Sequence, residues 1–170
     1  MTSPVKLFLM GAMGAGKSTI GKKVARKLDW PYFDNDGVLS ERSGKSIEEL
    51  SHMPIAQLHE LEFQQFQLFM DMPAPFIAGA AGSIVDRSEC LAQLKSETFA
   101  VYLHQPLDFL ERRKNSPGVG KQALASIGRG VIAERYERRD PLYRSVAQLI
   151  VPHELANKEK VELILKTLSL

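Results

Sequence analysis

Residues 11–19 read Gly-Ala-Met-Gly-Ala-Gly-Lys-Ser-Thr and fit the pattern G-x-x-x-x-G-K-[ST] of a phosphate-binding loop. The run before them, residues 5–10, is apolar and predicts a buried strand. After them, Ile20, Val24 and Leu28 recur at helical spacing and predict a helix. The alternative is a chance glycine-rich turn, and the strand and helix on either side argue against it.

The loop chemistry explains the spacing of its residues. Glycines let backbone N–H groups turn inward around a phosphate chain, and the helix N-terminus adds a partial positive charge. Lys17 is expected to reach the β- and γ-phosphates, and the hydroxyl of Ser18 is expected to bind Mg²⁺. The predicted nucleotide-binding residues are Gly11, Ala12, Met13, Gly14, Ala15, Gly16, Lys17, Ser18 and Thr19. The sequence thus predicts a nucleoside triphosphate site.

The composition is that of an ordinary globular protein. At 170 residues, 44% hydrophobic and 25% charged, the chain suits one domain over residues 1–170. Its apolar stretches are too short to span a bilayer, and it starts without a signal-peptide pattern. Cys90 is the single cysteine, so no intrachain disulfide forms. We expect a cytoplasmic monomer with no membrane partner.

Positive charge gathers in residues 112–144. This segment contains nine Lys or Arg and three Asp or Glu, so its net charge is +6. Because the whole chain has a net charge of +2, the remaining residues have a net charge of −4. Such a segment suits nucleic acid, the phosphates of ATP, an anionic substrate or a solvated helix face. Because no nucleic-acid-reading motif accompanies it, a small anionic substrate is favoured and no nucleic-acid partner is expected.

Strands and helices are expected to alternate along the chain. Further strands are expected at 31–34, 76–78, 98–103 and 147–151. Further helices are expected at 37–43, 46–52, 54–70, 90–94, 106–113, 125–139 and 158–168. Residues 46–49 resemble a capping box, and the polar, Gly- and Pro-containing segment 114–120 predicts a mobile loop. Within 54–70, burial is expected for Leu58, Leu61, Phe66 and Phe69.

This alternation predicts an α/β fold with three αβα layers around a parallel sheet of about five strands. In such folds ligands bind at the carboxyl ends of the strands. Residues 11–18, Asp34, residues 79–82 and the loop after Leu103 all follow predicted strands. The functional site is therefore expected along that edge.

Three segments together resemble the shikimate kinase family of small P-loop kinases, which is related to nucleoside monophosphate kinases. They are the loop and its continuation to Gly21, then Phe33-Asp34-Asn35-Asp36 with Glu41, Gly44, Ser46 and Ile47, and then Arg139-Asp140-Pro141-Leu142-Tyr143-Arg144-Ser145-Val146-Ala147. The resemblance covers nearly the whole chain. It implies a P-loop NTPase fold with a mobile lid near 114–124, and conversion of shikimate and ATP to shikimate 3-phosphate and ADP in aromatic amino acid biosynthesis.

The resemblance also assigns roles to the two aspartates. Asp34 would hold Mg²⁺ through water, together with Ser18. Asp36 would contact the shikimate hydroxyls and orient or deprotonate the attacking one. Carboxylates at a strand end suit a hard cation and a hydroxyl. The structural alternative for both is a turn or a helix cap.

Two arginines receive roles in the same way. Arg139 would grip the substrate carboxylate, in keeping with the bidentate pairing of guanidinium and carboxylate groups. The alternative for Arg139 is a surface ion pair. Arg113, or Arg112 in its place, would lie against the adenine.

Two departures from the family fall in the predicted substrate site. The family's arginine in the middle of the long helix aligns with His59, which is mostly neutral at pH 7 and cannot form a bidentate clamp. The family's Gly-Gly-Gly turn donates backbone N–H groups to the substrate and reads here as Ala80-Ala81-Gly82 or Gly79-Ala80-Ala81. The added methyl groups restrict φ and crowd a ligand.

The third departure is in the lid. The family's Arg-Pro-Leu-Leu corresponds to 121–124, Lys-Gln-Ala-Leu, and Lys121 is expected to assist phosphoryl transfer as a point charge. Residues 116–117, Ser-Pro, offer another alignment that has no charge. Three functions remain open: a kinase for shikimate, a kinase for gluconate or another polyhydroxy acid or cyclitol, and a non-catalytic ATP-binding module.

Overall fold

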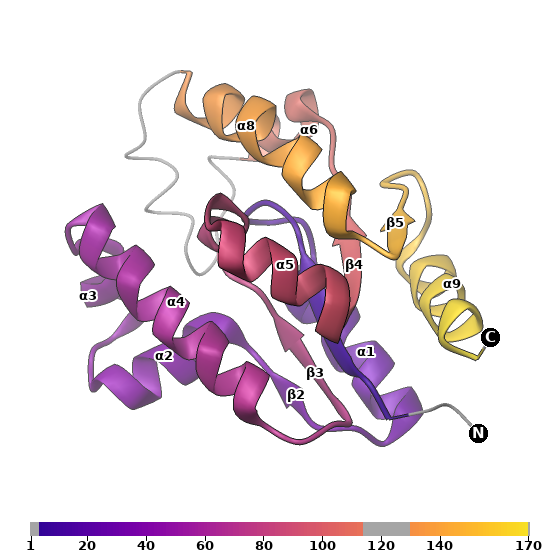
Figure 1. Cartoon of the computed structure of the whole chain (residues 1–170). Coiled ribbons are helices and arrows are strands. Elements are labelled where there is room, and N and C mark those ends of the chain that lie inside the picture. The colour runs from indigo at the N-terminus through magenta and orange to yellow at the C-terminus, as the bar shows by residue number, and fades with distance from the viewer. Residues whose placement is uncertain (1–3, 114–129, 170) are drawn as a thin grey trace.

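The computed structural model describes residues 4–113 and 130–169. One parallel sheet holds five strands in the order β2-β3-β1-β4-β5 (Figure 1). The strands are β1 (Lys6–Met10), β2 (Tyr32–Phe33), β3 (Phe76–Gly79), β4 (Phe99–Leu103) and β5 (Leu149–Val151). The predicted α/β class and its parallel sheet are confirmed.

The helices lie close to their expected positions. They are α1 (Lys17–Leu28), α2 (Asn35–Ser43), α3 (Ile47–Ser51), α4 (Ile55–Asp71), α5 (Ser88–Glu97), α6 (Leu107–Arg113), α8 (Val131–Val146) and α9 (Asn157–Leu168). The capping box is confirmed, since Ser46 and Glu49 bond each other's backbone N–H at the start of α3. A short 3₁₀ helix, η1 (Gly82–Asp86), stands where only a turn was expected. No helix in the described ranges is long and apolar enough to cross a membrane.

Helices cover both faces of the sheet. On one face α4, α5 and α8 pack over a core with an aromatic centre, where the ring centroid of Phe8 lies 5.2 Å from that of Phe66 and 5.8 Å from that of Phe76. On the other face, α1 and α9 bury a smaller aliphatic cluster. Phe66 and Phe69 are buried as expected, whereas Leu58 and Leu61 are only half-buried.

The helix expected at 125–139 was placed wrongly at its C-terminal end. Residues 125–129 lie outside the described ranges, and α8 runs from Val131 through Pro141 to Val146. Proline lacks the N–H that would continue the helix. Burial of Tyr143 and Val146 against the core offsets the missing bond. The longer helix places Arg139 inside α8, where its side chain contacts Asp86 of η1.

Candidate active site

The phosphate-binding loop connects the end of β1 to the start of α1. Gly16 has φ +99°, a conformation that favours glycine, and the first residue of α1 follows it. A Cβ at Gly11 would lie 2.9 Å from the carbonyl oxygen of Leu103 in β4, so the loop and β4 can approach only through glycine. The backbone therefore curves at the helix N-terminus, where phosphate groups bind.

Lys17 lies inside this curve. Its ammonium donates hydrogen bonds to the carbonyl oxygens of Gly11 at 2.6 Å and Ala12 at 3.0 Å. Burial lowers the pKa of Lys17 to about 8, although the charges of Asp36 and Asp34 oppose the shift. Within the described ranges, this desolvated cation is bonded only to neutral carbonyls, so it is well placed to exchange them for phosphate oxygens.

Ser18 and Asp34 meet beside the loop. The Ser18 hydroxyl donates to Asp34 Oδ1 at 2.5 Å, and Asp34 Oδ2 accepts from the backbone N–H of Gly37 at 3.2 Å. Asp34 therefore caps α2, which was the structural alternative for this residue, and its carboxylate also lines the cavity. Across the described ranges no three His, Cys, Asp or Glu side chains gather as a metal cage. Two protein oxygens completed by phosphate and water suit Mg²⁺.

Asp36 lies two residues after Asp34, in the first turn of α2. The Asn35 amide donates to Asp36 Oδ1 at 3.1 Å. Gln65 of α4 is completely buried and donates to the backbone oxygen of Asn35 at 2.7 Å and to its Oδ1 at 2.9 Å. Gln65 thus fixes the segment that carries both aspartates. Gln65 was not among the site residues predicted from the sequence, although a polar residue between aromatics on the buried face of a helix was an available signal for it.

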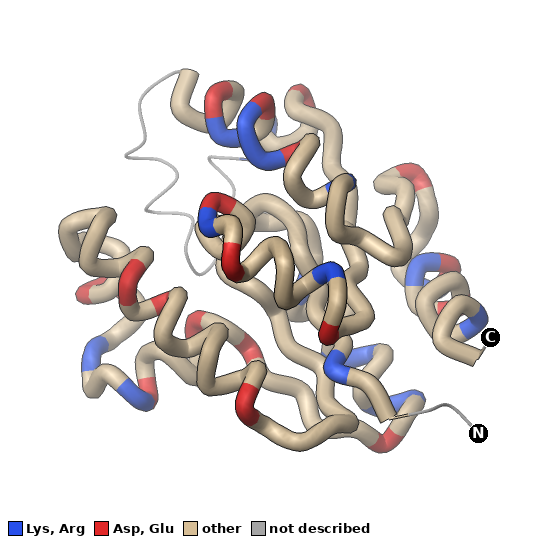
Figure 2. The backbone as a smooth tube through the Cα atoms, in the orientation of Figure 1, with Lys and Arg blue, Asp and Glu red and all other residues tan. Residues whose placement is uncertain are grey.

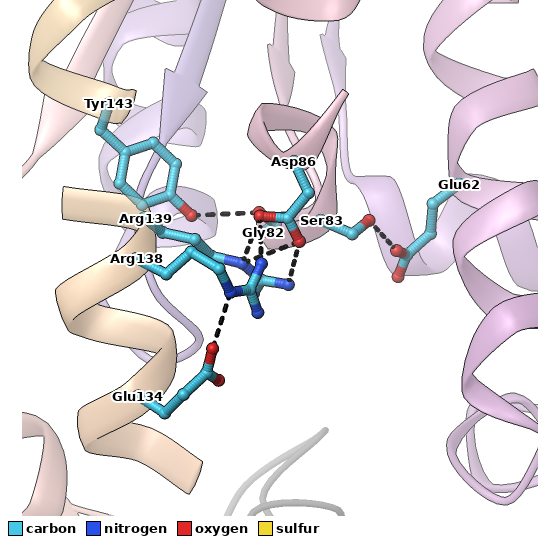
Figure 3. A network of polar contacts seen from close by, with 8 residues as sticks. All are labelled: Glu62, Gly82, Ser83, Asp86, Glu134, Arg138, Arg139 and Tyr143. Atoms are coloured by element: carbon cyan, nitrogen blue, oxygen red, sulfur yellow. Dashed lines mark hydrogen bonds and ion pairs between the residues drawn. The ribbon is translucent and has the colours of Figure 1, made fainter. Parts of the chain in front are cut away.

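Arg139 is held at the other end of the cavity by Asp86 of η1 (Figure 3). Its Nη2 donates to Asp86 Oδ2 at 2.8 Å and its Nε at 3.2 Å, while Arg138 Nη1 lies 2.5 Å from Asp86 Oδ1. Burial opposes ionisation of Asp86, yet the bonds from Arg139 and Arg138 lower its pKa. The alternative of an ion pair for Arg139 is thus present, but only 11% of its side chain is exposed. Arg139 Nη1 has no partner in the described ranges.

Glu62 of α4 faces this end of the cavity and hydrogen-bonds the hydroxyl of Ser83 (Figure 3). Burial raises the pKa of Glu62. Glu62, Ser83 and Asp86 were not among the site residues predicted from the sequence. Glu62 follows His59 by three positions, and that spacing on one helical face was the available signal.

The altered turn after β3 is only partly open to a ligand. The backbone N–H of Ala80 donates to the Leu9 oxygen at 2.9 Å, so it is not free for a substrate. The N–H groups of Ala81 and Gly82 have no acceptor among the described residues, and they keep that role as a prediction. A Cβ at Gly82 would lie 3.0 Å from Arg139 Nη1, so glycine is needed beside the guanidinium.

His59 and the two candidate adenine arginines are also placed. His59 lines the cavity, and burial followed by the charge of Arg139 lowers its pKa, which keeps it neutral near pH 7. Arg113 Nη1 donates to the Gly14 oxygen at 3.1 Å, and its guanidinium carbon lies 5.3 Å from the centroid of the Phe109 ring. Arg112 is exposed and pairs with Asp108. Of the two, Arg113 reaches the phosphate-binding loop. Lys121 and the predicted lid at 114–124 lie outside the described residues.

One cavity of about 940 Å³ joins these groups. It is lined by the phosphate-binding loop, the two aspartates, the turn after β3, and the side chains of His59, Glu62, Arg113 and Arg139. This volume is at the upper end of ligand pockets, enough for a nucleotide with a small second substrate beside it. A phosphate-binding loop that shares a cavity with a carboxylate pair and a buried arginine defines a P-loop phosphotransferase.

Comparison with known proteins gives the family. The family model described as shikimate kinase matches residues 13–169. The shikimate kinase of Neisseria meningitidis serogroup C (strain 053442) is 30% identical over 166 residues, which is 96% of each chain. The crystal structure of shikimate kinase from Bacteroides thetaiotaomicron has a TM-score of 0.79 at 27% identity and covers 99% of this chain and 100% of that chain. That from Aquifex aeolicus has a TM-score of 0.78 at 26% identity, with 96% of each chain covered. This chain belongs to the shikimate kinase family, and it is an ATP-using kinase that phosphorylates a hydroxyl of a small molecule.

The ion pair between Asp86 and Arg139 should contribute to stability. Asp86→Asn leaves two guanidinium groups without their shared carboxylate, and we expect the free energy of unfolding to fall by about 1–3 kcal/mol. Urea unfolding at pH 7 measures this. The matched control is Asp108→Asn, which breaks an exposed pair with Arg112 and should cost less than about 0.5 kcal/mol. Equal losses in the two variants would contradict the role given to Asp86.

Proposed function

We propose that this chain transfers the γ-phosphoryl group of Mg-ATP to a hydroxyl of shikimate. The observation that carries the proposal is that Asp36 and Arg139 line the same cavity as the phosphate-binding loop. A carboxylate near the phosphates suits a hydroxyl, and a nearly buried guanidinium further along suits a carboxylate. Shikimate carries both groups, and membership of the shikimate kinase family supports the same acceptor.

The nucleotide half of the cavity would bind ATP through residues of the loop. Lys17 would exchange its bonds to Gly11 and Ala12 for the β- and γ-phosphates, and Arg113 would lie against the adenine. Ser18 and Asp34 would hold Mg²⁺, which when bound supplies charge neutralisation for the phosphates. The distance between Ser18 Oγ and Asp34 Oδ1, 2.5 Å, supports this pairing, since both oxygens reach one point beside the loop.

The acceptor half would place one hydroxyl of shikimate in line with the γ-phosphorus. Its oxygen forms the new P–O bond while the bond from the γ-phosphorus to the bridging oxygen breaks, and ADP leaves. Asp36 accepts the proton of that hydroxyl, and Lys17 compensates the charge on the phosphates. Catalysis is then mainly positioning and charge compensation. Lys121 keeps its predicted role of assisting the transfer from the lid.

The remaining acceptor contacts come from three elements. Arg139 would bind the carboxylate through Nη1, the edge of its guanidinium that Asp86 leaves free. Neutral His59 would contribute a hydrogen bond without charge, and the N–H groups of Ala81 and Gly82 would donate to the acceptor. The acceptor site would therefore contain fewer flexible glycines and one arginine less than the family pattern.

Release of ADP from Mg-ATP, measured with and without shikimate, tests the proposal. We expect turnover that depends on shikimate and is lost in Lys17→Ala, with a monophosphate ester of shikimate identified by mass spectrometry. Gluconate and a cyclitol such as inositol are run in parallel. Turnover with one of these and none with shikimate would move the assignment to that acceptor. Tight ATP binding without turnover on any acceptor would favour a non-catalytic module.

A further inference from the structure

Three arginines, Arg135, Arg138 and Arg139, lie on α8 near the acceptor end of the cavity, and their pairing is unequal. Arg138 bonds Glu134 at 2.7 Å and Asp86 at 2.5 Å, and Arg139 bonds Asp86 at 2.8 Å. Arg135 has no hydrogen-bond or ion-pair partner among residues 4–113 and 130–169. The carboxylates of Asp86 and Glu134 thus pair with Arg138 and Arg139, whereas Arg135 forms no ion pair with a described residue.

The position of Arg135 directs this charge into the cavity. It precedes Arg139 by four residues, so both arginines project from one face of α8. Both line the cavity, and so does His59 of α4. Arg135 is half-buried, and burial followed by the charges of Arg139 and Arg138 lowers its pKa. A partly desolvated guanidinium that has no ion-pair partner in the described part of the chain favours an anionic ligand.

The opposing helix supplies no cation of its own. α4 contains no Lys or Arg, and Figure 2 shows only acidic residues coloured along it, whereas both basic and acidic residues are coloured on the N-terminal half of α8. His59 is the single basic side chain of α4, and its lowered pKa keeps it neutral near pH 7. Among the described residues of these two helices, a second positive contact to a carboxylate bound between them is therefore available from α8.

We propose that Arg135 is the second cationic contact to the acceptor carboxylate, acting with Arg139 from one face of α8 in place of an arginine on α4. The inference rests on the proposed function, because it takes shikimate as the acceptor. It makes Arg135 a specificity-determining residue. A neutral acceptor of the same shape would gain nothing from Arg135, whereas a carboxylate would be bound by both arginines.

The test compares shikimate with its uncharged methyl ester in wild type and in Arg135→Gln. For shikimate, we expect Arg135→Gln to raise KM about tenfold or more, the effect of losing a hydrogen bond to a charged group. The KM for the ester and the KM for ATP should change less than about twofold, since neither ligand presents a carboxylate to Arg135. Arg135→Lys, which keeps the charge without the planar fork, should give an intermediate KM for shikimate.

Arg144→Gln is the matched control, because it removes the same charge from α8 at a residue that pairs with Asp140 and does not line the cavity. It should leave the KM for shikimate within about twofold of wild type. Equal losses for shikimate and the ester in Arg135→Gln, or no loss for either, would overturn the inference and leave the proposed function standing. No response of the wild type to shikimate would instead overturn the proposed function, and this inference with it.

Discussion

Replacing Lys17 by methionine should abolish turnover while leaving the fold intact. Lys17 is the cation inside the phosphate-binding loop, bonded to the oxygens of Gly11 and Ala12 and well placed for the β- and γ-phosphates. Loss of one preorganised charge at a transferring group typically costs a factor of a hundred to a thousand, and here nucleotide binding weakens as well. We expect kcat/KM for ATP to fall at least about a thousandfold.

Stability separates this result from misfolding. Burial desolvates the Lys17 ammonium and lowers its pKa to about 8, and its hydrogen bonds among the described residues go to the neutral carbonyls of Gly11 and Ala12. Methionine fills a similar volume without a charge to desolvate, so Lys17→Met should unfold in urea at a midpoint equal to or above that of wild type. Lys22→Met, on the exposed side of α1, is the control and should retain activity. Retention of a tenth or more of wild-type kcat/KM in Lys17→Met would refute the role of this lysine.

The features that sequence predicted well are local ones. The phosphate-binding loop is a contiguous pattern, and the strands on either side of it are short apolar runs whose type does not depend on distant residues. Asp34 follows such a strand, whereas the roles of Asp34 and Asp36 come from the family resemblance and stay predictions. The chain order of strands and helices then implied a parallel sheet, which brings the strand ends to one edge.

The features that sequence missed depend on contacts between distant segments. Asp86 and Arg139 are separated by 53 positions, and neither residue alone indicates that they pair. Gln65 reaches Asn35 across 30 positions, and Glu62 reaches Ser83 across 21. In each case the local pattern at most suggests that a polar side chain faces the interior, and it does not indicate which distant residue that side chain contacts.

The continuation of α8 through Pro141 has the same origin. Local rules end a helix near proline. Here Tyr143 and Val146 pack against the sheet, with the Tyr143 ring stacked 4.7 Å from that of Tyr102. Tertiary packing thus overrode a local signal, and it also oriented Arg135 and Arg139 toward the cavity. Some residues of the acceptor site could therefore be predicted from the sequence, but the pairing of its arginines with carboxylates could not.

Replacing Asp36 by asparagine should lower kcat with little effect on ATP binding. The carboxylate of Asp36 is proposed to accept the proton of the attacking hydroxyl, and an amide of the same shape cannot do so. General base catalysis contributes a factor of about a hundred to ten thousand, so we expect kcat to fall within that range. Asparagine keeps the hydrogen-bonding outline, and Asn35, held by Gln65, keeps the segment in place. Steady-state kinetics with ATP and shikimate varied separately measures both effects.

The split between kcat and KM decides which role Asp36 has. A fall in kcat with KM for both substrates near wild type fits the proton acceptor, because the lost interaction is then made only in the transition state. A rise in KM for shikimate alone, at constant kcat, would refute that role and leave Asp36 as a binding residue. The control is Glu48→Gln on α3, an exposed carboxylate outside the cavity, which should match wild type in both constants.

Because Asp36 also helps to keep the Lys17 ammonium charged, Asp36→Asn should in addition lower the pKa of Lys17 further. That shift would appear as a loss of ATP affinity at a lower pH than in wild type, so the two carboxylates beside the loop act on the nucleotide as well as on the acceptor.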